Sequence, residues 1–390
     1  MSGNVWRLEA FRVLYWMHFV AAVLVPFFTE WGGLTLTQIM TLNAWFMAWT
    51  FALEIPTGAV ADYFGRKWSL VLGAAVTATA SLVYVSTPRY EVFLAAEVIF
   101  ALGYTLVSGA DEALLYDSLV ATGRVEHASR DIARLNAAQM VGLVTGALGG
   151  SVIAGVWGVR APLGCQAIPI TAAGLLAMSL VEPTAPVGRT RTTGYGALLG
   201  SGLRRLRDDA RMRIVAVDAV LVGALVWTLI WLYQPLLMRV GVPTSAFGTV
   251  HAALCLAQIA VLRSIHRLTP LVGGQVRYLR AAAVIPGFAI LALAWASSPT
   301  VTIALLLVAM GVGLSRMPIA SSAMNARVDA GGRATLLSTV SMLRTLTICL
   351  VNPIVGALAD RSLGITMSVL GFATLAVAVF SPLRERHLTD

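Results

Sequence analysis

The sequence predicts an all-α membrane protein with twelve transmembrane helices in two pseudo-symmetric six-helix bundles. Hydrophobic residues make up 58% of the chain, and the mean hydropathy is +0.79. Charged residues make up only 12%, about half the share that is typical of soluble domains. Apolar stretches near the roughly 20 residues that cross a bilayer recur along the whole chain. A soluble protein with a large core would need long charged surface segments, which this sequence lacks.

Glycine, proline and charged residues separate the apolar stretches and set the bounds of the expected helices. The eighth helix is the weakest, because it contains His251 and Gln258 and ends at Arg263. No cleavable signal peptide is expected, because no small-x-small site follows the first apolar run, Val13 to Phe28. The twelve expected spans are 8–29, 36–58, 67–87, 91–117, 133–156, 162–181, 213–238, 244–263, 277–297, 300–323, 335–359 and 364–382.

The basic residues predict the orientation, because arginine and lysine gather in the cytoplasmic loops of membrane proteins. With the N-terminus in the cytoplasm, 22 of the 28 basic residues lie in inner loops and tails, Arg12 among them, and four lie in outer loops. Arg316 and Arg344 lie within spans. Both termini are therefore expected in the cytoplasm. The net charge of +9 then belongs to the membrane surface, and no nucleic-acid partner is expected.

One long polar stretch divides the chain into an N-terminal bundle (1–182), a cytoplasmic linker (183–212) and a C-terminal bundle (213–390). Leucines at near-helical spacing beside arginines predict a short amphipathic helix on the inner leaflet. A disordered linker is the alternative for residues 183–196. The leucines are Leu198, Leu199, Leu203 and Leu206, and the arginines are Arg204, Arg205 and Arg207.

The stretch "GAVADYFGRK" at 58–67 falls between the second and third spans and resembles the signature of the major facilitator superfamily. The resemblance implies the superfamily fold, in which Asp62 caps the start of the eleventh span near residues 331–335. Arg66 needs an anion at the same depth, and Asp117 supplies one. Such a network would hold the cytoplasmic side shut in one of two conformations of similar energy. The predicted gate residues are Gly58, Asp62, Gly65, Arg66, Lys67 and Asp117.

The resemblance extends over both halves of the chain. The segments "ALEIPTG", "SGADEALLYD", "YQPLL" and "GRATLLSTVSMLR" look like a bacterial branch that contains many drug and metabolite exporters, so a bacterial inner membrane is the expected location. In the fifth span, "GLVTGALGG" keeps glycines that allow close helix packing. Ala147 stands where proton-coupled drug antiporters often carry proline, which weakens the assignment to antiport. Their span 4 arginine is also missing, and Glu97 lies in that region.

Ionisable residues inside membrane spans are costly and are candidates for function. The superfamily fold implies that spans 1, 4, 7 and 10 line the central cavity. Glu97 is the predicted proton or cation-substrate site, with His18 as its neighbour, because carboxyl and imidazole groups can exchange protons near neutral pH. The alternatives are a Glu97 hydrogen-bonded within the N-terminal bundle and a His18 that only packs. The cavity spans contain His18, Glu97, Asp111, Glu112, Asp218 and Arg316.

The remaining charges form two expected groups. Asp218, Arg316 and Arg344 are predicted to form a salt-bridge cluster, which either has a structural role or binds an anionic group. Glu54, Asp111 and Glu112 lie near the inner interface and are assigned to the gate network.

Aromatic residues indicate a mostly apolar binding pocket. Trp227 and Trp231 are spaced i, i+4 on a cavity helix and can stack on a ligand, although tryptophan more often anchors the membrane interface. The predicted substrate-binding residues are Trp227, Trp231, Tyr233, Gln234 and Arg316.

These features favour a monomeric secondary transporter that exports small amphipathic drugs or metabolites in exchange for protons, with the lipid bilayer as its other partner. The alternative is an uncoupled or importing transporter for an anionic metabolite, anchored by Arg316 and Arg344. No enzyme, cofactor or metal site is expected, because the sequence lacks a Walker loop and a catalytic Ser-His-Asp, di-His or Cys constellation. Cys165, Cys255 and Cys349 are expected to be buried small side chains.

Overall fold

The structure is a computed structural model that describes residues 3–183, 195–326 and 330–385. Within these ranges the regular elements are all helical. They form two compact units. The first unit contains Met1–Leu34, Leu42–Thr190 and Pro243–Ala252, and the second contains Thr35–Thr41, Arg191–Val242 and Ala253–Asp390. Each unit therefore includes a short piece from the opposite half of the sequence.

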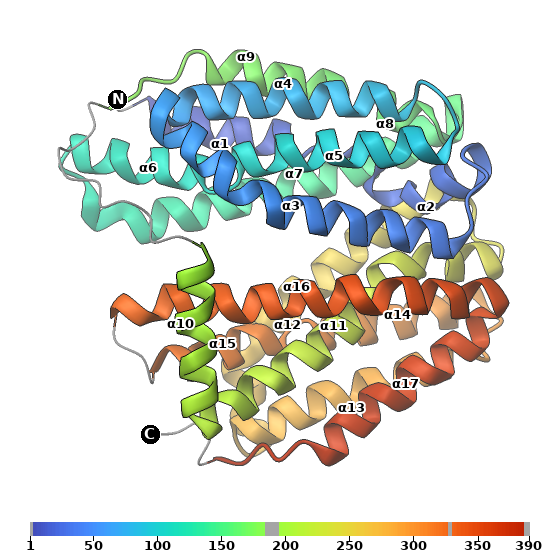
Figure 1. Cartoon of the computed structure of the whole chain (residues 1–390). Helices are drawn as coiled ribbons and strands as arrows, with labels where there is room; N and C mark the ends of the chain where they lie inside the picture. Colours follow the sequence, from blue (N-terminus) through green and yellow to red (C-terminus); the bar gives the residue numbers. More distant parts are fainter. Residues whose placement is uncertain (1–2, 184–194, 327–329, 386–390) are drawn as a thin grey trace. The chain divides into compact units, whose positions relative to one another are not determined.

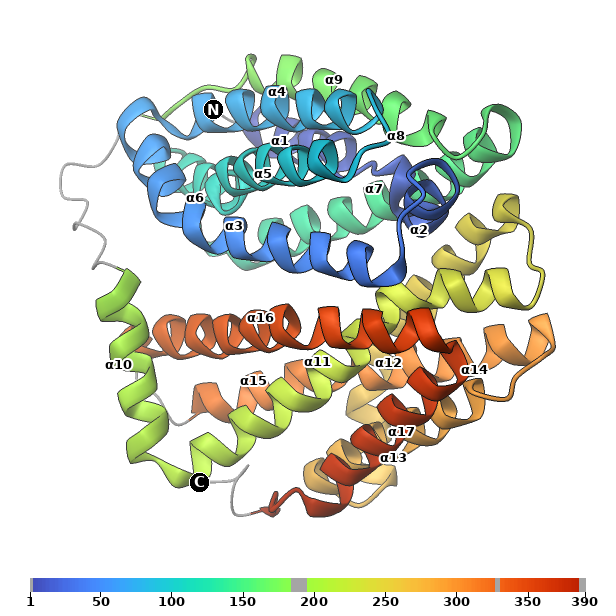
Figure 2. The same ribbon diagram turned by 45° about the vertical axis from the view of Figure 1, so that its right-hand side comes forward.

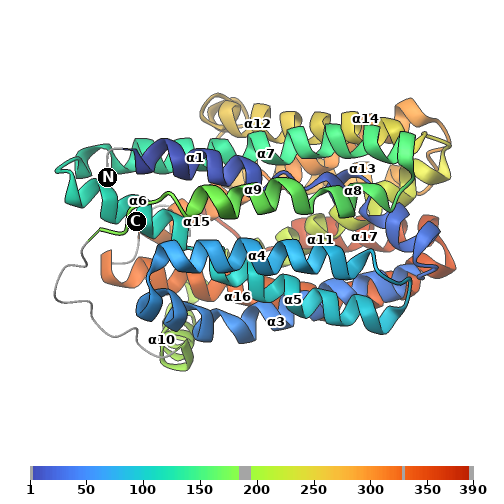
Figure 3. The same cartoon turned by 90° about the horizontal axis from the view of Figure 1, so that it is seen from above.

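The helices of the first unit lie side by side, as Figures 1 and 3 show for α1, α4, α5, α7 and α9. Their apolar faces meet in one core, to which Leu8, Phe11, Leu70, Leu114 and Ile170 contribute buried side chains. The elements are α1 Asn4–Tyr15, η1 Phe19–Ala22, α2 Leu24–Pro26, η2 Phe27–Trp31, α3 Leu36–Phe64, α4 Arg66–Tyr84, α5 Tyr90–Val107, α6 Ala110–Ala121, η3 Val125–His127, α7 Ala128–Trp157, α8 Ala161–Cys165 and α9 Ala167–Ala177.

The expected first span, 8–29, is not one helix. α1 ends at Tyr15, the backbone is non-helical through His18, and a 3₁₀ turn, a short α turn and a π turn follow. The broken segment packs on three glycines of α7, Gly142, Gly146 and Gly150, which contact the backbone of residues 13–19. An added Cβ at Gly150 would overlap the carbonyl group of Phe19. This approach requires glycine and confirms the close packing expected from "GLVTGALGG".

The break leaves backbone groups that need partners inside the bundle. The buried side chain of Gln166 provides one, because its Oε1 accepts a hydrogen bond of 3.4 Å from the Val20 amide. Within the chain around the break, His18 N donates to Trp16 O at 2.8 Å, and Ala21 N donates to His18 O at 3.1 Å. The break is thus supported by both local and long-range hydrogen bonds.

The second unit contains the remaining helices, and Figure 2 shows α16 and α17 beside α11 and α13. α10 lies crosswise to α16 in Figures 1 and 2, and its Leu206 is buried in the core of this unit with Met212 and Leu336. Residues 184–194 of the predicted linker lie outside the described residues. The elements are α10 Tyr195–Asp208, α11 Ala210–Arg239, η4 Thr244–Ala246, α12 Phe247–Leu271, α13 Gln275–Leu293, α14 Pro299–Gly313, α15 Arg316–Ala326, α16 Ala330–Arg361 and α17 Leu363–Phe380. η4 and the first residues of α12 belong to the first unit.

Nine helices of the described chain are long and apolar enough to span a membrane, and they coincide with nine of the twelve expected spans. The other three expected spans are not among these nine helices, each for a different reason. The first is broken, the second (α3) is long but carries more polar residues, and the sixth is a 17-residue apolar stretch, Ala161–Ala177. The count of twelve and the cytoplasmic termini therefore stay predictions.

Candidate functional site

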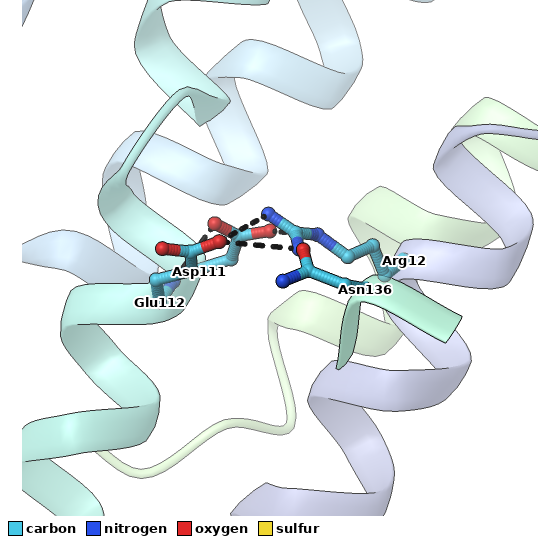
Figure 4. Close-up of polar contacts among 4 residues, drawn as sticks. All are labelled: Arg12, Asp111, Glu112 and Asn136. Carbon is cyan, nitrogen blue, oxygen red and sulfur yellow. Dashed lines mark hydrogen bonds and ion pairs between the residues drawn. The ribbon is translucent and has the colours of Figure 1, made fainter. Parts of the chain in front are cut away.

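A charge cluster lies inside the first unit, and Figure 4 shows its four residues. Arg12 and Asp111 are buried, whereas the Glu112 side chain is 43% exposed. Arg12 of α1 is 2.7 Å from Asp111 through its Nε and 3.3 Å from Glu112 through its Nη2. Its Nη1 donates a hydrogen bond of 2.8 Å to Asn136 Oδ1 of α7. The side chains of Arg12 and Asp111 are 9% and 2% exposed. Arg12 was expected among the basic residues of the inner surface, and its burial corrects that prediction.

The two carboxylates occupy the first turn of α6, where the helix dipole favours negative charge. A break precedes this turn, because Gly109 has φ +76° and separates α5 from α6 within the expected fourth span. Asp111 Oδ1 also accepts a hydrogen bond of 2.8 Å from the Glu112 amide. The cluster therefore contains two carboxylates and one guanidinium, so it carries one net negative charge when both acids are ionised.

Aromatic side chains adjoin this cluster at the break in the first span. The His18 ring stacks on Trp16 with centroids 5.4 Å apart and meets the edge of Phe100 at 6.0 Å. Trp16 also meets Tyr104 at 6.1 Å, and Tyr104 interacts electrostatically with Arg12 and Asp111. His18 hydrogen-bonds to the backbone of Tyr15, whereas its buried Nε2 has no partner in the described structure. The arrangement combines an apolar surface with one unsatisfied imidazole nitrogen.

Glu97 lies elsewhere in the same unit. It is 8% exposed and hydrogen-bonds to the buried Tyr84 of α4, close to the aromatic cluster of Phe27, Phe28 and Phe93. No described contact joins it to His18, although the two were expected as neighbours. This geometry is that of the alternative in which Glu97 bonds within the N-terminal bundle.

The signature segment forms the predicted ion pair. Arg66 Nη1 lies 2.6 Å from Asp117 Oδ2, and both belong to the first unit. Gly65 has φ +92°, a conformation that glycine adopts readily, and precedes α4. The Glu182 carboxylate accepts hydrogen bonds from the Arg66 and Lys67 amides at 2.9 and 2.7 Å, so it caps α4. Sequence reasoning missed Glu182 because it falls at the start of the polar stretch.

The other residues that were predicted to belong to the gate or its network have different surroundings in the described structure. Asp62 is exposed on α3, and side chains of most of its expected partner region, 331–335, lie outside the described residues. A Cβ added at Gly58 would meet no described atom within 4 Å. Asp111 and Glu112 contact Arg12, and their assignment to the gate network stays a prediction. Glu54 is exposed and interacts electrostatically with Tyr104.

A second copy of the first half of the signature lies at the end of α16. The stretch "GALAD" at 356–360 repeats "GAVAD" at 58–62, a signal that the prediction did not use. Within the second unit, Asp360 accepts hydrogen bonds from the Leu36 and Thr37 amides at 2.7 and 3.0 Å. A Cβ added at Gly356 would lie 2.7 Å from Thr37 Cα. Asp360 thus caps the first turn of α3.

Arg316, which is buried, and Arg344, which is half-buried, have different surroundings in the second unit. Arg316 pairs with Asp218 and donates a hydrogen bond to Leu279 O, while Ser381 donates to Asp218 at 2.7 Å. Arg344 instead lies 5.9 Å from the centre of the Trp227 ring and has no ion-pair partner in the described chain. The expected three-residue cluster is therefore one pair and one separate arginine. Arg316 is 4% exposed and neutralised, which favours the structural role over substrate binding.

The other predicted substrate residues divide by exposure. Tyr233 and Gln234 are buried, and Gln234 Nε2 donates to the Tyr233 hydroxyl at 2.9 Å. Trp227 and Trp231 are half-buried on α11. No group of three or more His, Cys, Asp or Glu side chains in the described ranges is arranged to hold a metal ion. The three cysteines are half-buried and form no disulfide in the described structure.

Comparison with known proteins agrees with this architecture. A family model described as Major Facilitator Superfamily matches residues 11–351. The nucleoside transporter NupG is similar at 14% identity and a TM-score of 0.82, covering 99% of both chains. A bacterial homologue of the human lysosomal transporter Spinster has 17% identity and a TM-score of 0.73, covering 97% of this chain and 94% of that one. At these identities the likeness shows the fold. A comparison with curated proteins finds no match.

Proposed function

We propose a transport function from one premise: this chain belongs to the Major Facilitator Superfamily. It is a multi-pass membrane protein with a transporter fold rather than an enzyme. Within that family we assign it to secondary active transport by alternating access, with proton entry driving the export of small amphipathic molecules. The exporter branch, the proton coupling and the bacterial inner membrane are parts of this proposal.

The observation that carries the proposal is the excess carboxylate at Arg12. Two acids share one guanidinium, and Asp111 is buried in the apolar bundle while the Glu112 side chain is 43% exposed. A single proton therefore balances the cluster, and its loss leaves one uncompensated charge. A site that changes charge by one proton couples protonation to conformation, because the two protonation states differ in their preference for a water-accessible arrangement. Tyr104 joins this cluster to the aromatic surface at Trp16, where an amphipathic substrate can stack.

Two groups from the sequence prediction remain in the proposal. Glu97 and His18 are the second candidate for proton coupling, Glu97 through Tyr84 and His18 through its unsatisfied Nε2. The proposed gate is the signature segment with Asp117. The support for that gate is the Arg66–Asp117 pair and the Glu182 cap of α4.

Inside-out vesicles with an acidic interior test the coupling. Cationic, neutral and anionic amphipathic compounds are added in turn, and a pH-sensitive dye reports the gradient. Selected compounds are expected to collapse the gradient with the unaltered protein and not with Asp111→Asn, which leaves one acid per arginine. Glu97→Gln is compared in parallel, and Glu91→Gln is the control because Glu91 is 74% exposed at the start of α5. If both Asp111→Asn and Glu97→Gln collapse the gradient as fully as the unaltered protein does, neither proposed coupling site is correct.

An uncoupled or importing transporter for an anionic metabolite is the second candidate. One observation favours it: Arg344 is a half-buried cation without an acid partner in the described chain, whereas Arg316 is neutralised by Asp218. Uptake that persists at equal pH on both sides, and that no carboxylate variant alters, would select this candidate.

A further inference from the structure

We infer that the second unit contains a subsite for an anionic, hydrogen-bond-accepting group, formed by Arg344 of α16 and Trp227 of α11. The inference deepens the proposed function, because it names the chemical class of the substrate head group. It applies to either transport direction.

The first step is the charge of Arg344. An unpaired cation inside a membrane span is costly and is retained where it has a partner or a ligand. Arg344 lies 14 residues after Ala330, the first residue of α16, which is roughly 21 Å along the helix at 1.5 Å per residue. Arg316 shows how this unit accommodates a structural arginine. Asp218 neutralises its charge, the Leu279 carbonyl accepts a hydrogen bond from it, and Ser381 donates to Asp218. No described carboxylate pairs with Arg344.

The second step is its position. A Cβ added at Gly223 of α11 would lie 3.6 Å from Arg344 Cδ, so the aliphatic part of the arginine rests beside this glycine. Trp227 lies one helical turn further along α11, and the guanidinium carbon is 5.9 Å from its ring centre. The stem is therefore held against α11 while the ring supports the cation. The guanidinium is pre-oriented without its charge being neutralised.

The third step is the unsatisfied donors. Arg344 Nε and Trp227 Nε1 are both buried and both lack a hydrogen-bond partner in the described structure. Buried donors without partners are rare and costly. These two donors lie on neighbouring helices, and one of them is cationic. A ligand that satisfies both would need a hydrogen-bond acceptor that carries negative charge. A carboxylate matches the planar donor fork of arginine, and an aromatic body attached to it can stack beside Trp227.

Matched aryl probes test this inference. The protein is reconstituted in purely zwitterionic lipid, so that no anionic head group competes, and binding of 2-naphthoate and 2-naphthamide is measured. The carboxylate is expected to bind at least about tenfold more tightly than the amide, as a charge-assisted contact to arginine implies. Arg344→Gln is expected to remove the preference, and Arg344→Lys to retain part of it. Trp227→Phe is expected to weaken carboxylate binding a few-fold while preserving the preference.

Arg267→Gln is the matched control, because it removes one positive charge from the exposed surface of α12 in the same unit. It should leave the preference unchanged. Equal binding of both probes to the unaltered protein would overturn the subsite, and so would a preference that survives in Arg344→Gln. In the proposed function, gradient collapse in the vesicle assay depends on the acid cluster of the first unit, which contains neither Arg344 nor Trp227. Equal binding of both probes to an unaltered protein that still couples transport to protons would therefore reject the subsite alone.

Discussion

At the scale of single residues, neighbouring glycines of α7 have different roles. Gly150 contacts the backbone of Phe19 so closely that no side chain fits, whereas a Cβ at Gly149 would lie 3.5 Å from the Phe19 ring, an ordinary contact. Only one of the two is therefore needed for the packing of the broken first span.

Gly150→Ala is expected to destabilise the protein by about 1–3 kcal/mol, because the added methyl group forces the Phe19 backbone away from α7. Gly149→Ala serves as its partner measurement and should change stability by less than about 0.5 kcal/mol. Thermal unfolding in detergent compares the two. Equal melting temperatures for both variants would show that the close approach at Gly150 does not support the fold.

At the scale of secondary-structure elements, two helix starts are capped by residues that lie far away in the sequence. α3 and α4 both begin at carboxylates from distant segments, Asp360 and Glu182 respectively. In each case the acid satisfies amides that a helix start leaves without partners. The local sequence around residue 36 or 66 contains no indication of either partner.

Asp360→Ala is expected to loosen the first turn of α3. Loss of a helix cap costs about 1 kcal/mol, which corresponds to roughly fivefold faster amide exchange near residues 36–38. Hydrogen–deuterium exchange with mass spectrometry measures this directly. Arg361→Gln, at the exposed neighbouring position, should leave exchange there unaltered. Unchanged protection in Asp360→Ala would mean that another group holds this turn.

At the scale of the whole molecule, the distribution of basic residues still predicts twelve spans with both termini in the cytoplasm. Fusions of a cytoplasm-active reporter and a periplasm-active reporter after residue 390 and within the loop at 158–160 test this. The first reporter should be active at the C-terminus and the second in the loop. The reverse pattern would require another span count or orientation.

The helical class, most helix positions and the superfamily could be predicted from the sequence, because hydropathy and the signature are local patterns. The Arg66–Asp117 pair was also predicted, since both ends of that contact lie near the same expected membrane surface. The break after Tyr15 could not be predicted, because its cause lies in the glycines of α7 and the local sequence contains neither proline nor glycine. Whether an arginine within a span meets an acid also depends on how its helix is rotated. Arg316 and Arg344 looked equivalent in the sequence, yet only Arg316 meets an acid.

Each unit includes a short segment from the opposite half of the sequence, and this determines when each unit can finish folding during synthesis. The first unit includes residues 243–252, and Gly248 packs against the Ala147 backbone and Ser151 of α7. The ribosome makes α7 about one hundred residues before that glycine, so this face of the helix must wait without its native partner. The N-terminal half therefore cannot reach its final packing alone. A chain cut within residues 184–194 would complete its first unit only when both fragments are made in the same cell.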